Sequence, residues 1–179
     1  MTTPIDSTPA TNSTTTPPRR PTSADVELLG FAQSAELTAR DLYRQAIEAG
    51  AGEEHVASLV ALAAHHDAYA QSISATIGTA APQARNEELF AALQQRFGRN
   101  TNQVALAAHE LENRLVVTHR SLLENLDGTE GSALVASIMI TEARHAVALA
   151  TIAGLSPVTE SDAFLVTTDL APLSPAFPA

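Results

Sequence analysis

The chain contains four long stretches in which apolar residues recur every three or four positions. This spacing places the apolar residues on one face of an α-helix and is typical of amphipathic helices that pack around a shared core. Glycines or other turn-forming residues follow the stretches, as they commonly do at helix C-termini. The pattern predicts helices over 24–49, 53–77, 102–126 and 133–154, with a shorter amphipathic helix near 86–97.

The last of these stretches carries titratable residues within its apolar stripe, which reads Val135, Ile138, Glu142, His145, Leu149 and Ile152. A buried carboxylate is costly unless it is paired or coordinates a metal ion. Glu-x-x-His directed into a helical bundle is the ligand unit of carboxylate-bridged di-metal proteins. A match of four residues is short, so an incidental buried pair is the alternative interpretation.

The other three stretches each place a polar residue in the same position of the stripe: Glu36, His66 and Glu112. Glu112 follows Glu36 by 76 residues, and Glu142 follows His66 by the same 76. At this offset Tyr43 aligns with His119, Tyr69 with His145 and Gly78 with Gly154. The repeat predicts an all-α four-helix bundle made of two helix hairpins, which are joined by a long crossover after Gly78.

Composition limits the partners of such a bundle. The 179 residues carry a net charge of −10, which argues against nucleic acid, and the absence of cysteine excludes disulfides and thiolate metal ligands. No apolar run is long enough, without interruption by charges, to predict a membrane span. We expect one domain at 22–155, a disordered Thr/Pro-rich tail at 1–21, and a Pro-rich tail at 156–179 that packs along the bundle or frays. No signal peptide is recognised, which favours a cytoplasmic location.

With its inward polar residues and its 76-residue repeat, the chain resembles the ferritin-like superfamily, which includes ferritins and rubrerythrins. The resemblance extends from about Ala24 to Gly154. The tail from Phe164 to Pro178 and the paired His65-His66 are most similar to actinobacterial ferritin-like-domain proteins. Many of those proteins are exported, so an exported protein is the alternative location. The resemblance implies a metal site whose candidate ligands are Glu36, His66, Glu112, Glu142 and His145.

The second helix departs from the family pattern, because His66 stands where a Glu is expected and Tyr69 where a His is expected. The resemblance thus implies a metal-binding, oxidase-like protein with an incomplete di-iron-type site. One Fe or Mn ion at Glu142 and His145 is the economical arrangement, and two ions would need water or Tyr69 to complete the ligands. The alternative is a non-catalytic bundle without metal that serves as a structural or interaction module. No organic cofactor is expected, and the catalytic residues are not indicated.

Other polar residues are assigned to simpler roles. Tyr43 and His119 each lie about two turns from the Glu of their own helix, so we expect supporting donors or side chains that join core and surface. His65 is expected to face solvent or a neighbouring helix, and His109 the exposed face of the third long helix. Alanine-rich helix faces also allow a homodimer.

Overall fold

The four predicted long helices are present in the computed structural model, which describes residues 16–164 and 170–173. The helices are α1 (Ser23–Glu48), α2 (Val56–Ile77), α4 (Thr101–Leu123) and α5 (Thr129–Ile152), with the short α3 (Glu87–Leu93) between α2 and α4. Single 3-10 turns are η1 (Glu53–His55), η2 (Gly78–Ala80), η3 (Gln94–Arg96) and η4 (Ser161–Phe164). The residues described contain no β-strand, which confirms the all-α prediction.

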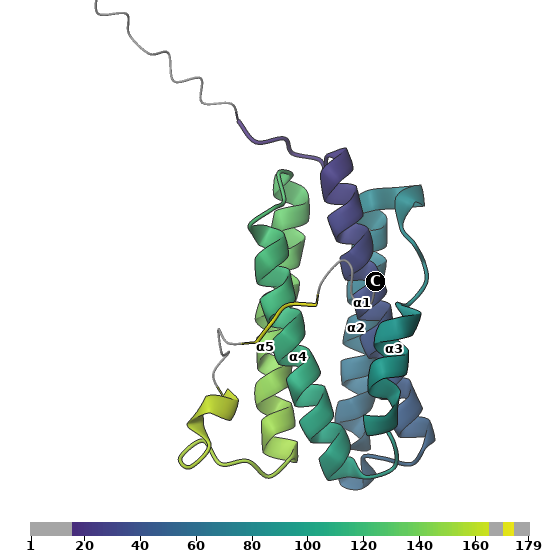
Figure 1. Cartoon of the computed structure of the whole chain (residues 1–179), viewed down its shortest axis with the longest axis vertical. Helices are drawn as coiled ribbons and strands as arrows, with labels where there is room; N and C mark the ends of the chain where they lie inside the picture. Colours follow the sequence, from purple (N-terminus) through teal and green to yellow (C-terminus); the bar gives the residue numbers. More distant parts are fainter. Residues whose placement is uncertain (1–15, 165–169, 174–179) are drawn as a thin grey trace, which may run out of the picture.

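The helices form two antiparallel hairpins, α1 with α2 and α4 with α5, which lie side by side (Figure 1). Gly50 and Gly52 reverse the chain between α1 and α2 with φ angles of 90° and 104°. A Cβ at Gly52 would lie 2.9 Å from the Val56 Cα, so only glycine fits this turn. The segment between α2 and α4 runs back along α1, where Gln45 donates from Nε2 to the carbonyls of Gln94 and Phe97. The predicted crossover between the hairpins is therefore observed.

The start of α1 is fixed to the turn between α4 and α5. Thr22 and Asp25 form a capping box, and Asp25 has no exposed surface. The Asp25 carboxylate also accepts from the backbone N–H groups of Asp127 at 2.8 Å and Gly128 at 2.9 Å. One side chain thus satisfies donors from segments about 100 residues apart and sets how the two hairpins meet at this end.

Helix α5 begins four residues before the predicted start at 133. Gly131 therefore lies inside the helix, where a Cβ would come 3.2 Å from the Leu29 Cδ1. The first N–H groups of α5 are satisfied from the N-terminal segment, because Thr129 and Glu130 donate to the carbonyls of Pro18 and Arg19. These residues belong to the tail predicted as disordered, of which residues 1–15 lie outside the described part.

Two apolar clusters fill the bundle, one at each end. One contains Leu42, Leu59, Leu111, Leu115 and Leu149, and the other Leu29, Ile73, Leu122, Val135 and Ile138. On α2 and α5 the candidate metal ligands lie between these two sets, whereas on α4 Glu112 lies between Leu111 and Leu115 of the first cluster. Because both ends are closed by apolar packing, the polar layer at mid-bundle is separated from the water at either end.

The described part of the C-terminal tail contacts α4. Leu173 is 2% exposed within the apolar cluster of Leu42 and Leu59, and its backbone N–H donates to Thr118 Oγ1 at 2.7 Å. Figure 1 shows this segment crossing α4. Packing along the bundle, the first of the two predicted alternatives, is thus observed at Leu173, whereas 165–169 and 174–179 lie outside the described residues.

Helix α5 is long and apolar enough to cross a membrane by length and composition alone, which the sequence analysis did not predict. In the bundle it packs along α4 and directs Glu142 and His145 inward, so its apolar composition has an explanation in the core. Core helices commonly meet the same length and composition test.

Candidate metal centre

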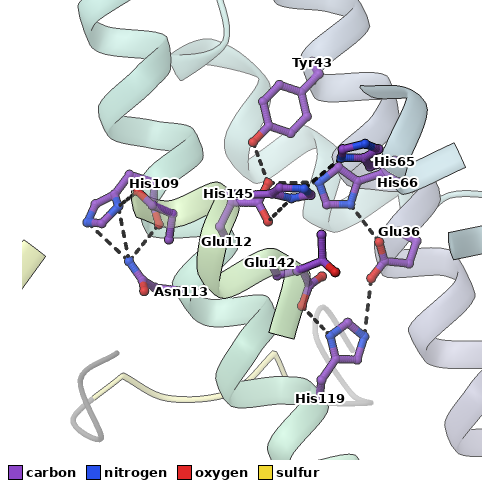
Figure 2. A network of polar contacts seen from close by, with 12 residues as sticks. Glu36, Tyr43, His65, His66, His109, Glu112, Asn113, His119, Glu142 and His145 are labelled. Atoms are coloured by element: carbon purple, nitrogen blue, oxygen red, sulfur yellow. Dashed lines mark hydrogen bonds and ion pairs between the residues drawn. The ribbon is translucent and has the colours of Figure 1, made fainter. Parts of the chain in front are cut away.

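All four long helices contribute to one polar layer. Glu36 comes from α1, His66 from α2, Glu112 from α4, and Glu142 and His145 from α5; the first four have no exposed surface and His145 is 5% exposed. They meet because each occupies the inward stripe of its helix at the same depth. The structure therefore brings together the five residues that the sequence singled out, and it adds His119 from α4 (Figure 2).

One group of potential ligands consists of His66, Glu112 and His145. Their ligand atoms lie within 4.8 Å of one another. His66 Nε2 is 2.9 Å from Glu112 Oε1, and His145 Nδ1 is 3.4 Å from Glu112 Oε2. The Tyr43 hydroxyl donates to Glu112 Oε1 at 2.6 Å. In this group, hereafter the His66 triad, the Glu112 carboxylate is surrounded by partners.

The second group consists of Glu36, His119 and Glu142, again with ligand atoms within 4.8 Å. His119 lies between the two carboxylates, with Nδ1 2.7 Å from Glu142 Oε2 and Nε2 3.3 Å from Glu36 Oε1 (Figure 2). Three buried atoms of this group, Glu36 Oε1, His119 Nε2 and Glu142 Oε1, form no hydrogen bond among the described residues, since the 3.3 Å contact between Glu36 Oε1 and His119 Nε2 lacks hydrogen-bond geometry. In contrast to the first group, this His119 triad carries unused ligand atoms.

Comparison with known families gives one match, to a family model described as a ferritin-like domain, over residues 24–155. The chain belongs to the ferritin-like family. Searches of curated proteins and of solved structures find no match. The similarity to actinobacterial members stays a prediction, because the family model does not distinguish between branches.

His66 links the two triads of the ferritin-like domain. The Nδ1 atom of His66 lies 2.7 Å from Glu36 Oε2, and its Nε2 atom contacts Glu112. Burial lowers the pKa of His66, but the charges and hydrogen bonds of Glu112 and Glu36 outweigh it and hold that pKa well above its ordinary value. Burial likewise favours a protonated Glu112, yet His66 and His145 lower the pKa of Glu112. The ion-free core thus contains an imidazolium between two carboxylates.

The His119 triad has the opposite electrostatics. Burial, followed by the nearby Glu36 and Glu112 carboxylates, raises the pKa of Glu142 well above its ordinary value. Burial also lowers the pKa of His119, so its imidazole is neutral. A neutral imidazole with an unpaired nitrogen is the form that binds a metal ion.

The donor set fits the metal ions that this family implies. Two imidazoles with one carboxylate form the ligand type of non-haem iron sites, and two carboxylates with one imidazole suit iron or manganese. The orphaned atoms of the His119 triad give the fit a structural basis, since a cation would satisfy all three. Glu142 and His145, predicted as ligands of one ion, lie in different triads of this structure.

Tyr43 and His119 have larger roles than the sequence analysis gave them. Of the two roles expected for Tyr43, the supporting donor is the one observed: its side chain has no exposed surface and its hydroxyl donates to Glu112, and burial together with Glu112 raises the pKa of that hydroxyl well above the ordinary value. The expected roles of Tyr43 and His119 rested on their distance from the Glu of their own helix. Their partners are on other helices: Tyr43 contacts Glu112 of α4, and His119 contacts Glu36 of α1 and Glu142 of α5. Their places in the apolar stripe were the signal that could have indicated this.

Three further residues complete the surroundings. His65 is exposed and contacts His145 of the neighbouring helix, in line with the prediction for it. His109 was predicted on the exposed face but is half-buried, with Nδ1 3.0 Å from the Ala146 carbonyl oxygen. Tyr69 is half-buried beside His66, and burial raises the pKa of its hydroxyl to about 12 even though a hydrogen bond with Thr141 lowers it. A protonated phenol is a poor metal ligand at neutral pH.

Proposed function

We propose that this ferritin-like protein binds divalent metal ions, iron or manganese, in the polar layer of its bundle. The observation that carries the proposal is the His119 triad, in which three buried ligand atoms lack a partner and lie close enough to share one cation. Unpaired buried polar atoms cost about 1–3 kcal/mol each, so a site for an ion accounts for their arrangement.

The two triads would hold up to two ions. Glu36, His119 and Glu142 would bind one, and His66, Glu112 and His145 the other. The chemistry on offer with iron or manganese bound is redox cycling and Lewis acidity, which is the basis for an oxidase-like role toward oxygen species. Tyr43 would hold the Glu112 carboxylate in position through its 2.6 Å hydrogen bond, in the way that partners of metal ligands commonly do.

The second candidate function is a metal-free structural bundle, and the position of His66 favours it. An imidazolium bonded to Glu36 and Glu112 closes part of the polar layer without any ion. In that case a proton on His66, in place of a metal ion, compensates the charge of Glu112 in its own triad and of Glu36 in the other. The two candidates differ in whether added metal stabilises the fold.

Elemental analysis of protein purified without chelator, followed by titration with manganese(II) or anaerobic iron(II), tests the proposal. We expect one to two ions per chain and, at a free ion concentration 100 times the Kd, about 2.7 kcal/mol of added stability. His119→Gln should lose the ion of its triad, because Gln offers no imidazole. His109→Gln is the matched control on the same helix, since His109 bonds the Ala146 carbonyl and belongs to neither triad.

Protein that contains no metal as purified, and whose melting temperature stays the same with either ion, would overturn the proposal in favour of the structural bundle. Equal stoichiometry in His119→Gln and wild-type protein would instead show that the ion binds elsewhere.

A further inference from the structure

The polar layer reaches solvent at one point among its six potential ligands. Glu36, His66, Glu112, His119 and Glu142 have no exposed surface, whereas His145 is 5% exposed. Apolar clusters close the bundle above and below this layer. An ion that enters the folded protein by the shortest path from solvent would therefore meet His145 before any other member of the triads.

His65 lies over this point. It is exposed on α2, and its Nδ1 lies 2.9 Å from Nε2 of His145 on α5. The two rings lie edge to edge in nearly the same plane, with centroids 5.1 Å apart and planes 11° from parallel. Figure 2 shows His65 on the side of His145 that faces away from Glu142 and His119. Neither triad includes His65.

From His65 inward, polar atoms follow one another at short spacing. His145 is 3.4 Å from Glu112, Glu112 is 2.9 Å from His66, and His66 is 2.7 Å from Glu36. Glu36 is 3.3 Å from His119, which completes a line of ligand atoms from the surface to the deepest triad. A cation that moves along this line has the next nitrogen or oxygen ligand within reach at each step, which offsets the cost of its desolvation.

We propose that His65 is the entry ligand of the bundle: it captures a divalent cation at the surface and transfers it to His145. This inference rests on the proposed metal binding and adds a residue that lies outside both triads. Imidazole is a common ligand of iron, zinc and other first-row divalent ions, and an exposed histidine in contact with His145 is placed to exchange water for protein ligands.

A residue on the path but outside the final site changes the rates of loading and release by the same factor and leaves the equilibrium unchanged. For His65→Ala we expect both rates to fall about tenfold, the equivalent of one lost charge-assisted contact, with the Kd within about twofold of wild type. Stopped-flow loading with cobalt(II), followed by its visible absorption, gives the first rate, and competition with a chelator gives the second.

Two other roles of His65 predict different results, and either would overturn the proposal. A lid that covers His145 would make both rates rise when the side chain is removed. A partner that only orients His145 as a ligand would raise the Kd through faster release, because such partners affect affinity about 10- to 100-fold.

A pair of variants separates ligation from bulk. His65→Glu places a carboxylate ligand at the entrance, so its loading rate should be much closer to wild type than that of His65→Ala. His65→Gln has a side chain of similar size but is a poorer ligand, so it should load as slowly as His65→Ala. His55→Ala is the control for loss of a surface histidine, since His55 lies in η1 away from both triads. If wild-type protein takes up no cobalt, manganese or iron, both proposals fail; if it loads and His65→Ala loads at the same rate, only the entry role fails.

Discussion

Substitution of Tyr43 by Phe removes one hydroxyl group from the centre of the bundle and leaves the ring in place. The hydroxyl donates to Glu112 Oε1 at 2.6 Å, and both side chains have no exposed surface. Because the ring keeps its shape, the substitution creates little cavity, and its cost is that of the hydrogen bond. The measurement therefore reports how much one buried phenol contributes to holding the Glu112 carboxylate.

The magnitude follows from the charge of the acceptor. A hydrogen bond to a charged group contributes about 1.5–3 kcal/mol, and a neutral one about 0.5–1.5 kcal/mol. His66 and His145 lower the pKa of Glu112 and keep it ionised, so the upper range applies. For a chain of this size each kcal/mol shifts the melting temperature by about 2–4 °C, so we expect a fall of about 3–12 °C.

The assay is thermal and urea unfolding of chelator-treated protein, with Tyr69→Phe as the matched control. Tyr69 loses the same atom, but its ring is half-buried and its hydroxyl is bonded to the neutral Thr141, so we expect a cost below about 1.5 kcal/mol. Equal costs in the two variants, or no cost at Tyr43, would refute the assignment of Glu112 as a buried carboxylate held by Tyr43.

Two further predictions concern the contacts that fix the ends of the chain to the bundle. Asp25→Asn should cost about 2–4 kcal/mol in urea unfolding at neutral pH, because an amide can accept from fewer of the N–H groups of Thr22, Asp127 and Gly128. These hydrogen bonds outweigh burial and lower the pKa of Asp25, so the advantage of wild type is complete above about pH 4 and is lost as the pH falls through the folded-state pKa. Leu173→Ala should cost about 2–4 kcal/mol, since the side chain is 2% exposed against α4. Val158→Ala, at a position 88% exposed, should cost less than about 0.5 kcal/mol.

The sequence predicts the helices and their inward faces well, because both depend on spacing within a helix. The residues Glu36, His66 and Glu112 were found in this way, and the structure buries all three. Gly131 shows the limit of local signals. The predicted helix start at 133 leaves it outside the helix, but it lies inside α5, where Leu29 of another helix packs closely against it.

Contacts between helices are harder to predict, because they depend on the register that loops and packing impose. His119 is seven residues from Glu112 along α4, about 10 Å by helix rise, and was therefore assigned a supporting role. In the structure its neighbours are Glu36 and Glu142, which come from α1 and α5. The division of the ligands into two triads depends on the same register and could not be obtained from the spacing of Glu142 and His145.

The 76-residue repeat gives a physical reason for the division of the ligands into two triads. Tyr43 aligns with His119 and Glu112 with Glu36, so the Tyr43–Glu112 contact from α1 to α4 corresponds to the His119–Glu36 contact from α4 to α1. The two halves thus make the same contact with different chemistry, a phenol in one and an imidazole in the other.

Tyr69 and His145 form a second pair of the same kind. At both positions the first hairpin carries a phenol and the second an imidazole, so the second hairpin supplies two of the three histidines in the triads. A protonated phenol can donate a hydrogen bond to a carboxylate but is a poor ligand at neutral pH, whereas a neutral imidazole can bind an ion. The symmetry of the fold therefore fixes where ligands can lie, and the tyrosine-for-histidine difference makes the two triads unequal: Tyr43 donates a hydrogen bond to Glu112 in one triad, whereas His119 Nε2 in the other lies 3.3 Å from Glu36 without forming one.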